Sequence, residues 1–211
     1  MRILMILALL VVLAASSFAQ LTSDQKTTDF LALAASYNRN YGPYQWKIQA
    51  FGYDMLKLQP WLAQVNAAHT DLEFYDVCVR YVASLNDYHA NFLLPVDYEA
   101  WLPLTVDIYD GKVLIDGIDR RVLDPQTYPF QIGDELVSLD GRSPADWIQA
   151  LLPYATGGHG NPSTGARLAV AAMLDRYQNA YPFAANTHAG DNSTVVIRSQ
   201  GKAVSYQMTW L

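Results

Sequence analysis

The sequence predicts an α+β protein in which a helical N-terminal part is followed by a strand-rich part. Two observations support this prediction. Before Asn86 the apolar residues recur at helical spacing, and after Pro95 they alternate with other residues, as in a half-buried strand. The stretch Leu85–Pro95 joins the two parts and contains Asp-Tyr-His at residues 87–89. If the chain performs chemistry, we expect it at this junction.

A junction loop is normally exposed, so we expect the His89 ring at the surface with Asp87 within reach of the ring or of the nearby backbone. We expect the apolar residues that follow to turn inward and anchor the loop: Phe92, Leu93 and Leu94.

Three helices are expected in the first part, over 23–37, 46–58 and 70–86. Pro60 is expected to end the second, because the residue before a proline is biased away from helical conformation. The third opens with a capping box, in which Thr70 is the N-cap and Glu73 is its partner three residues later.

The second part predicts short strands separated by glycine turns and interrupted by two helices. The expected strands are 102–108, 112–118, 136–139, 195–197 and 203–210, and the expected helices are 143–152 and 164–177. Ser143 as N-cap followed by Pro144 at the first helical position defines the start of the first of these helices. The glycine-rich stretch 154–161 and the stretch 182–192 predict irregular structure.

The N-terminus predicts a secretory signal peptide. Arg2 precedes an unbroken apolar run, Ile3–Ala15, and Ser17-Phe18-Ala19 has small residues at both positions that a signal peptidase requires. A membrane anchor is the alternative, but the run is short for a span and no stop-transfer pattern follows. We therefore expect cleavage after Ala19 and export to the periplasm or the extracellular space.

Composition and residue spacing exclude several classes of function. A net charge of −6 does not suit nucleic-acid binding, which needs a basic surface. The single cysteine, Cys78, lies on the apolar face of the third expected helix and predicts a buried side chain rather than a disulfide. The four histidines, His69, His89, His159 and His188, lack metal-ligand spacing, so we expect no metal and no cofactor. Gly157–Gly160 lacks the lysine and hydroxyl residue of a phosphate loop.

Asp87-x-His89 is the main candidate for chemistry. A carboxylate beside a histidine can orient the ring and keep it basic, as a general base requires. The alternative is a histidine that satisfies loop backbone or a helix end. No Gly-x-Ser-x-Gly elbow accompanies it, and Ser138 and Ser163 lie in a predicted strand and at a helix start. The residues thus indicate a base without its nucleophile.

The order of motifs resembles the tail-specific, or C-terminal processing, serine proteases. The resemblance rests on Leu-x-Asp-x-His at 85–89 followed by Ile-Gly-Asp-Glu-Leu-Val-Ser-Leu-Asp-Gly at 132–141, which resembles a strand and turn of their PDZ-like domain. It extends from about Tyr37 to Trp210. Asp-Tyr-His-Ala at 87–90, the lead-in Trp46–Gly52 and a glycine-rich insertion in the PDZ-like module resemble one chlamydial branch of the superfamily in particular.

This resemblance implies a domain plan and a role for His89. Residues 1–19 would be the signal peptide, 20–95 a helical domain, and 96–211 a PDZ-like domain with an insertion at about 153–192. His89 matches the catalytic base, whereas the α/β domain with the serine nucleophile has no counterpart in these 211 residues. We therefore expect a portion of a longer protein, inactive by itself. Other branches use a Ser-Lys dyad, in which this histidine is not essential.

Two functions from different classes follow. The first is the N-terminal portion of an exported serine-type endopeptidase, with polypeptide substrates and a full-length protein that could form a homodimer. The second is a stand-alone exported PDZ-like module that binds peptides without catalysis, by adding a strand to a sheet edge and capturing a carboxylate at backbone N–H groups. A structural domain without a ligand is a third reading. Neither nucleic acid nor stable membrane insertion after signal cleavage is expected.

Overall fold

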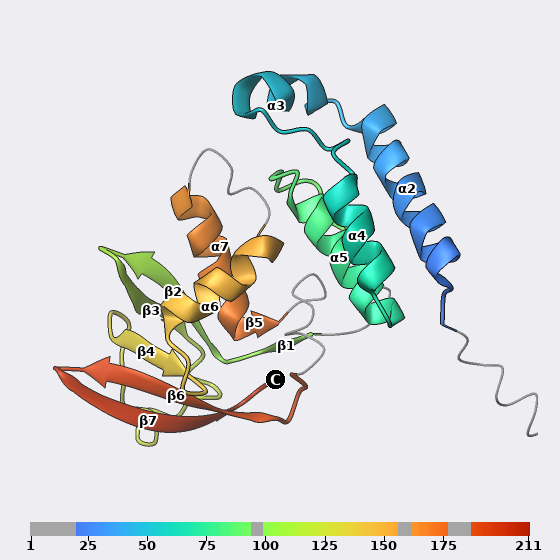
Figure 1. The fold of residues 1–211 in the computed structure, drawn as a ribbon. Coiled ribbons are helices and arrows are strands. Elements are labelled where there is room, and N and C mark those ends of the chain that lie inside the picture. Colours follow the sequence, from blue (N-terminus) through green and yellow to red (C-terminus); the bar gives the residue numbers. More distant parts are fainter. Residues whose placement is uncertain (1–19, 94–98, 156–161, 177–186) are drawn as a thin grey trace, which may run out of the picture. The chain divides into compact units, whose positions relative to one another are not determined.

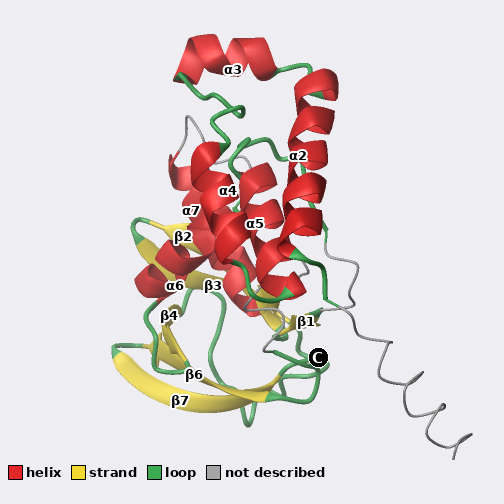
Figure 2. Cartoon of the chain, turned by 45° about the vertical axis from the view of Figure 1, so that its right-hand side comes forward, coloured by secondary structure: helices red, strands yellow, loops and turns green. Residues whose placement is uncertain are grey.

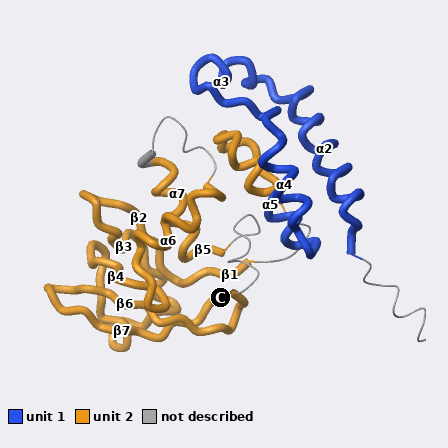
Figure 3. Tube along the Cα trace, viewed as in Figure 1, with its two compact units in different colours: residues 1–77 blue, residues 78–211 orange. Residues whose placement is uncertain are grey.

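The computed structural model describes residues 20–93, 99–155, 162–176 and 187–211 of the chain (Figure 1). Among these residues, helices come first and every strand follows residue 99 (Figure 2), which confirms the predicted α+β order. The chain divides into two compact units, residues 1–77 and 78–211, and the division lies within one helix (Figure 3). The expected signal peptide, residues 1–19, and the loop Gly157–Gly160 lie outside the described residues.

The helices before the junction are α2 (Ser23–Asn40), α3 (Tyr44–Phe51), α4 (Gln59–Ala67) and α5 (Asp71–Ala83). The second predicted helix was wrong in its extent. Gly52 in a left-handed conformation, with φ of 62°, ends α3, and a separate helix, α4, begins at Gln59. Pro60 lies in the first turn of α4, where its missing N–H has no helical partner to lose, so it starts a helix rather than ending one.

Polar side chains define the start of two of these helices. Thr22 caps α2 through a reciprocal pair of hydrogen bonds with Gln25, of 3.2 and 2.8 Å. The predicted capping box of α5 is confirmed: the Glu73 N–H donates to Thr70 Oγ1 at 3.1 Å, and the Glu73 carboxylate accepts from the Thr70 N–H at 3.0 Å. These bonds satisfy amides that a helix start leaves unpaired.

In the first unit, α2 packs against α4. Phe30, Ala34 and Val65 are buried there. Lys26 is also buried, and its Nζ lies 3.3 Å from the Ala68 carbonyl oxygen and 3.6 Å from Asp71 Oδ1. A buried cation requires such partners.

The second unit contains a five-stranded antiparallel sheet with the order β2-β3-β4-β6-β7. The strands are β2 (Leu104–Tyr109), β3 (Lys112–Ile118), β4 (Glu135–Leu139), β6 (Asn192–Ser199) and β7 (Lys202–Thr209). Both predicted hairpins are confirmed. The turn residues Asp110-Gly111 and Gln200-Gly201 all have positive φ, between 47° and 82°, as two-residue hairpin turns require.

Two helices, α6 (Pro144–Leu151) and α7 (Pro162–Leu174), pack against each other and share an apolar core with the sheet (Figure 1). Ser143 caps α6 as predicted, with its Oγ accepting the Asp146 N–H at 3.2 Å. The largest fully buried side chains of this core are Phe130, Ile115, Leu136, Leu139, Leu151, Met173, Ile197 and Met208. The same core includes Ala100 and residues of β2, so it connects the chain from Ala100 to Trp210.

A two-stranded sheet lies beside this core, formed by β1 (Ala100–Trp101) and β5 (Asp175–Arg176). The last predicted helix therefore ends at Leu174, three residues earlier than expected. Leu211 extends the pairing on β1: its N–H donates to the Trp101 carbonyl at 2.9 Å and its carbonyl accepts from the Trp101 N–H at 3.2 Å.

Arg176 of β5 is a buried cation in the second unit, 2% exposed. Its guanidinium lies 4.5 Å from the ring centroid of Trp147 and 5.3 Å from that of Trp210, and it donates to the Ala172 carbonyl at 2.9 Å. Burial lowers the pKa of Arg176 to about 10, so it remains charged at neutral pH.

No helix in the described ranges combines the length and apolar character that crossing a membrane would need.

Candidate functional site

The Asp-x-His loop begins where α5 ends. The predicted helix end at Asn86 was three residues too late, because α5 stops at Ala83 and turn hydrogen bonds continue the chain to Asn86. Asn86 adopts φ of 51°, a left-handed conformation that asparagine tolerates better than most residues, and its Nδ2 donates to the Ser84 carbonyl at 2.7 Å. This reversal turns the next residues out of the helix direction.

Asp87 fixes both the backbone and the ring of His89. Its Oδ1 accepts the His89 N–H at 3.0 Å and lies 3.2 Å from His89 Nδ1. The His89 side chain is 93% exposed and that of Asp87 is 19% exposed. The expected surface position of His89 and the reach of Asp87 are therefore confirmed. Because Nδ1 faces the carboxylate, Nε2 on the other side of the ring faces solvent.

The residues that anchor the Asp-x-His loop differ from those that the sequence predicted. We expected Phe92, Leu93 and Leu94 to turn inward, but Leu93 is 50% exposed, Phe92 is half-buried, and Leu94 lies outside the described residues. Leu85 and Ala90, on either side of the Asp-x-His, are buried instead. They anchor the loop and leave the intervening side chains at the surface.

No nucleophile accompanies this base among the described residues. Within them, Asp87 is the only hydrogen-bond partner of the His89 ring, and Ser138 lies within β4. Across the same ranges, no group of three His, Cys, Asp or Glu side chains could hold a metal ion. His188 forms its own pair with Asp191, at 3.4 Å. The expected burial of Cys78 is confirmed.

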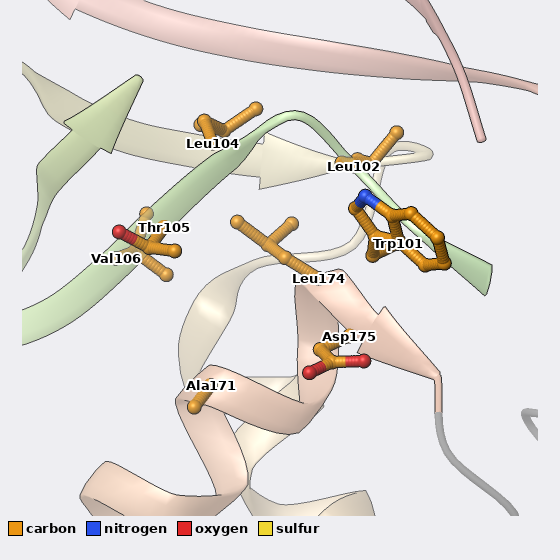
Figure 4. A pocket seen from close by; sticks show the side chains of 8 residues that line it. All are labelled: Trp101, Leu102, Leu104, Thr105, Val106, Ala171, Leu174 and Asp175. Atoms are coloured by element: carbon orange, nitrogen blue, oxygen red, sulfur yellow. The ribbon is translucent and has the colours of Figure 1, made fainter. Parts of the chain in front are cut away.

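A second candidate site lies between β2 and α7. The strand β2 is at one edge of the sheet, and α7 packs against it. Between them is a pocket of about 190 Å³ with largely apolar walls (Figure 4). Its lining residues are Trp101, Leu102, Leu104, Thr105, Val106, Ala171, Leu174 and Asp175. This volume is below the range of about 300–1,000 Å³ typical of small-molecule sites, and it suits one apolar side chain better.

An ion pair joins the strand to the helix beyond this pocket. Arg167 of α7 donates from Nε to both carboxylate oxygens of Asp107, at 2.9 and 3.0 Å, and from a terminal nitrogen to Oδ2. Hydrogen bonding from Arg167 lowers the pKa of Asp107. Asp107 Oδ1 also accepts the N–H of Ile108 at 2.7 Å. The pair thus marks one end of the groove between β2 and α7.

Sequence reasoning found the Asp-x-His loop but missed the groove. Arg167 and Asp107 are 60 residues apart, so no local pattern connects them. A weak signal was present in Asp107, a carboxylate within a strand whose other residues are largely apolar.

Comparison with known proteins identifies the class. A family model described as PDZ domain matches residues 98–211, which include the sheet, the groove and the helices α6 and α7. This match covers more than half of the chain. The chain therefore belongs to the PDZ-domain family.

Chlamydial proteins are among those similar to this chain. Two solved structures of mature CPAF, the chlamydial protease-like activity factor, one of them complexed with lactacystin, match 89% of this chain with a TM-score of 0.72 and 21% identity. A Chlamydia pneumoniae protein, CPj1016/CpB1054, is 28% identical over 136 residues, or 62% of this chain. The predicted resemblance to a chlamydial branch is confirmed. The chain spans about a third of the CPAF chains, 34–35%, and 21% of the C. pneumoniae protein.

Proposed function

We propose that this chain is the N-terminal portion of an exported serine-type endopeptidase in which His89 is the general base. The observation that supports this most is the exposed His89 ring, with Nδ1 held by Asp87 at 3.2 Å. A structural histidine would be expected to bury its ring or to use it to bond the backbone. Here the carboxylate orients a ring whose Nε2 is directed to solvent.

In the proposed reaction, the serine nucleophile comes from outside these 211 residues. His89 Nε2 takes the proton from the serine hydroxyl as the oxygen attacks the scissile carbonyl, and later returns it to the leaving amine. Asp87 keeps Nδ1 as the donor nitrogen and stabilises the imidazolium that forms. The fold shared with CPAF over 89% of the chain supports this placement of the base.

The base assignment is tested in the full-length protein with a fluorogenic peptide substrate. His89→Ala is expected to lower kcat by several powers of ten, because base and nucleophile act as one unit. The urea midpoint should hardly move, since the ring is 93% exposed. His188→Ala is the matched control, because His188 is also exposed and pairs with an aspartate. A His89→Ala enzyme that keeps more than about a tenth of its rate would rule out the base and indicate a Ser-Lys dyad instead.

For the 211-residue chain alone, the proposal expects no peptidase activity and no adduct with a serine-directed fluorophosphonate. Stoichiometric labelling of any serine in the chain would contradict the placement of the nucleophile outside it.

Export is a separate part of the proposal and rests on the residues of the signal sequence. Exported protein should begin at Gln20 when its N-terminus is sequenced. An exported chain that still carries Met1 would contradict this part.

Peptide binding by the PDZ domain is a second candidate function, favoured by the apolar pocket beside the edge strand β2. An extended peptide could add a strand to β2 and insert a side chain into the pocket. In an NMR titration, such a peptide should shift the amide signals of β2 and α7. An unchanged spectrum at millimolar peptide would contradict this function.

A further inference from the structure

The backbone at the start of β2 has few donors left to offer a ligand. The Trp101 N–H donates to Leu211, the Leu102 N–H donates to the Leu174 carbonyl at 2.9 Å, and the Leu104 N–H donates to the Leu102 carbonyl at 2.8 Å. Pro103 between them has no N–H. A terminal carboxylate is captured by several converging N–H groups. All four residues that enter the strand beside the pocket therefore lack the donors for that capture.

The charge at this end of the pocket is also unfavourable to an anion. Asp175 is one of the lining residues, and it pairs with Trp101 across the short strands β1 and β5 (Figure 4). Burial, and then the nearby negative charge of Glu99, raise the pKa of Asp175. Two carboxylates near each other attract a cation and repel a carboxylate.

The open part of the β2 edge is short. The Ile108 N–H bonds to the side chain of Asp107 rather than to β3, so it faces the outer edge, and that position is closed by the Asp107–Arg167 pair. Pairing groups alternate along a strand, so the backbone groups of Val106 face the same edge. An added strand therefore has room at Leu104–Val106, next to the pocket.

We propose that the groove between β2 and α7 binds an internal segment of an extended polypeptide, with an apolar residue in the pocket and a lysine or arginine beside it facing Asp175 and Glu99. This inference rests on the proposed peptide-binding function and specifies its ligand. The apolar side chain fills the space between Leu104, Val106 and Leu174, and the backbone pairs with Val106. The cation meets the only charged side chain among the residues that line the pocket.

The test uses the purified, isotope-labelled chain and nine-residue peptides followed by NMR. The first peptide is acetylated and amidated, with leucine followed by arginine at its centre. The second replaces that arginine with glutamate, and the third ends at the leucine with a free carboxylate. We expect the first to bind at Leu104–Val106. The glutamate peptide should bind at least about fivefold more weakly, because it loses one exposed ion pair and its carboxylate is repelled by Asp175 and Glu99.

Chain variants separate the pocket from the charge. Asp175→Asn should reduce the arginine-over-glutamate preference to twofold or less, whereas Asp29→Asn, the same change at an exposed helical position of the first unit, should leave it intact. Ala171→Phe should fill the pocket and lower the affinity for the first peptide at least tenfold. Ala145→Phe, at an exposed position of α6, is its matched control.

The outcomes distinguish this inference from the function on which it rests. Tighter binding of the free-carboxylate peptide at the groove would leave peptide binding intact and overturn the internal, basic ligand. A failure of all three peptides at millimolar concentration would overturn both. Equal binding of the arginine and glutamate peptides would overturn the role of Asp175 and Glu99.

Discussion

Replacement of Arg176 tests whether packing or charge holds the second unit together around this residue. Burial lowers the pKa of Arg176 to about 10, well below the usual range of a guanidinium, and so disfavours the charged form by about 3 kcal/mol at about 1.4 kcal/mol per pKa unit. Contacts with two indole rings, at 4.5 and 5.3 Å, return about 1–2 kcal/mol each in a desolvated site. The two contributions roughly cancel, so the charge itself should add little net stability.

Arg176→Met should therefore change the free energy of unfolding by less than about 1.5 kcal/mol, since methionine fills similar space and its sulfur packs well on aromatic rings. Arg176→Ala should cost about 2–4 kcal/mol, because it leaves a cavity between Trp147 and Trp210. Urea unfolding followed by tryptophan fluorescence measures both, with near-UV circular dichroism as a check on indole packing. A methionine variant as unstable as the alanine variant would refute this reasoning and show that the charge is required.

Three further predictions concern the strands and helix caps. Gly117→Ala should cost about 1–2 kcal/mol in urea unfolding, because the new Cβ would clash with Thr105 Oγ1, and adding Thr105→Ala should recover part of that loss. Thr70→Ala should cost about 1 kcal/mol by removing the cap of α5; an unchanged midpoint would contradict the role of that hydrogen bond. Because Arg167 lowers the pKa of folded Asp107 below its unfolded value, the pair stabilises the fold above the unfolded pKa, near 4, and loses this effect as the pH falls through the folded pKa. In the Asp107→Asn variant, the free energy of unfolding should therefore fall less steeply as the pH is lowered below about 4. An unchanged pH dependence would contradict the stabilising role of the Asp107–Arg167 pair.

Short-range chemistry was the part of the fold that the sequence predicted well. The Thr70 cap and the Asp110-Gly111 turn each depend on residues within four positions of one another, so the pattern is complete in the sequence. The Asp87–His89 contact could be predicted for the same reason, because the two residues are two positions apart. The alternation of apolar residues correctly predicted strand β2, because one face of that strand is buried.

The predictions that were wrong or missing depend on where a residue lies within a helix or within the folded sheet. Pro60 was taken to end a helix, although a proline within the first turn favours a helix start, and Gly52 was the true stop. The groove could not be predicted, because it depends on which strand forms the sheet edge and which helix covers it. Asp107 and Arg167 meet only once that topology is known.

The pairing of Leu211 with Trp101 holds the backbone of residue 211 in one orientation. Two backbone hydrogen bonds set both its position and its direction, antiparallel to β1. A segment attached there would run antiparallel to β1, toward its Ala100 end. Because the direction of such a segment is already set at its first residue, it would lose less conformational freedom on packing than a segment attached through a flexible linker.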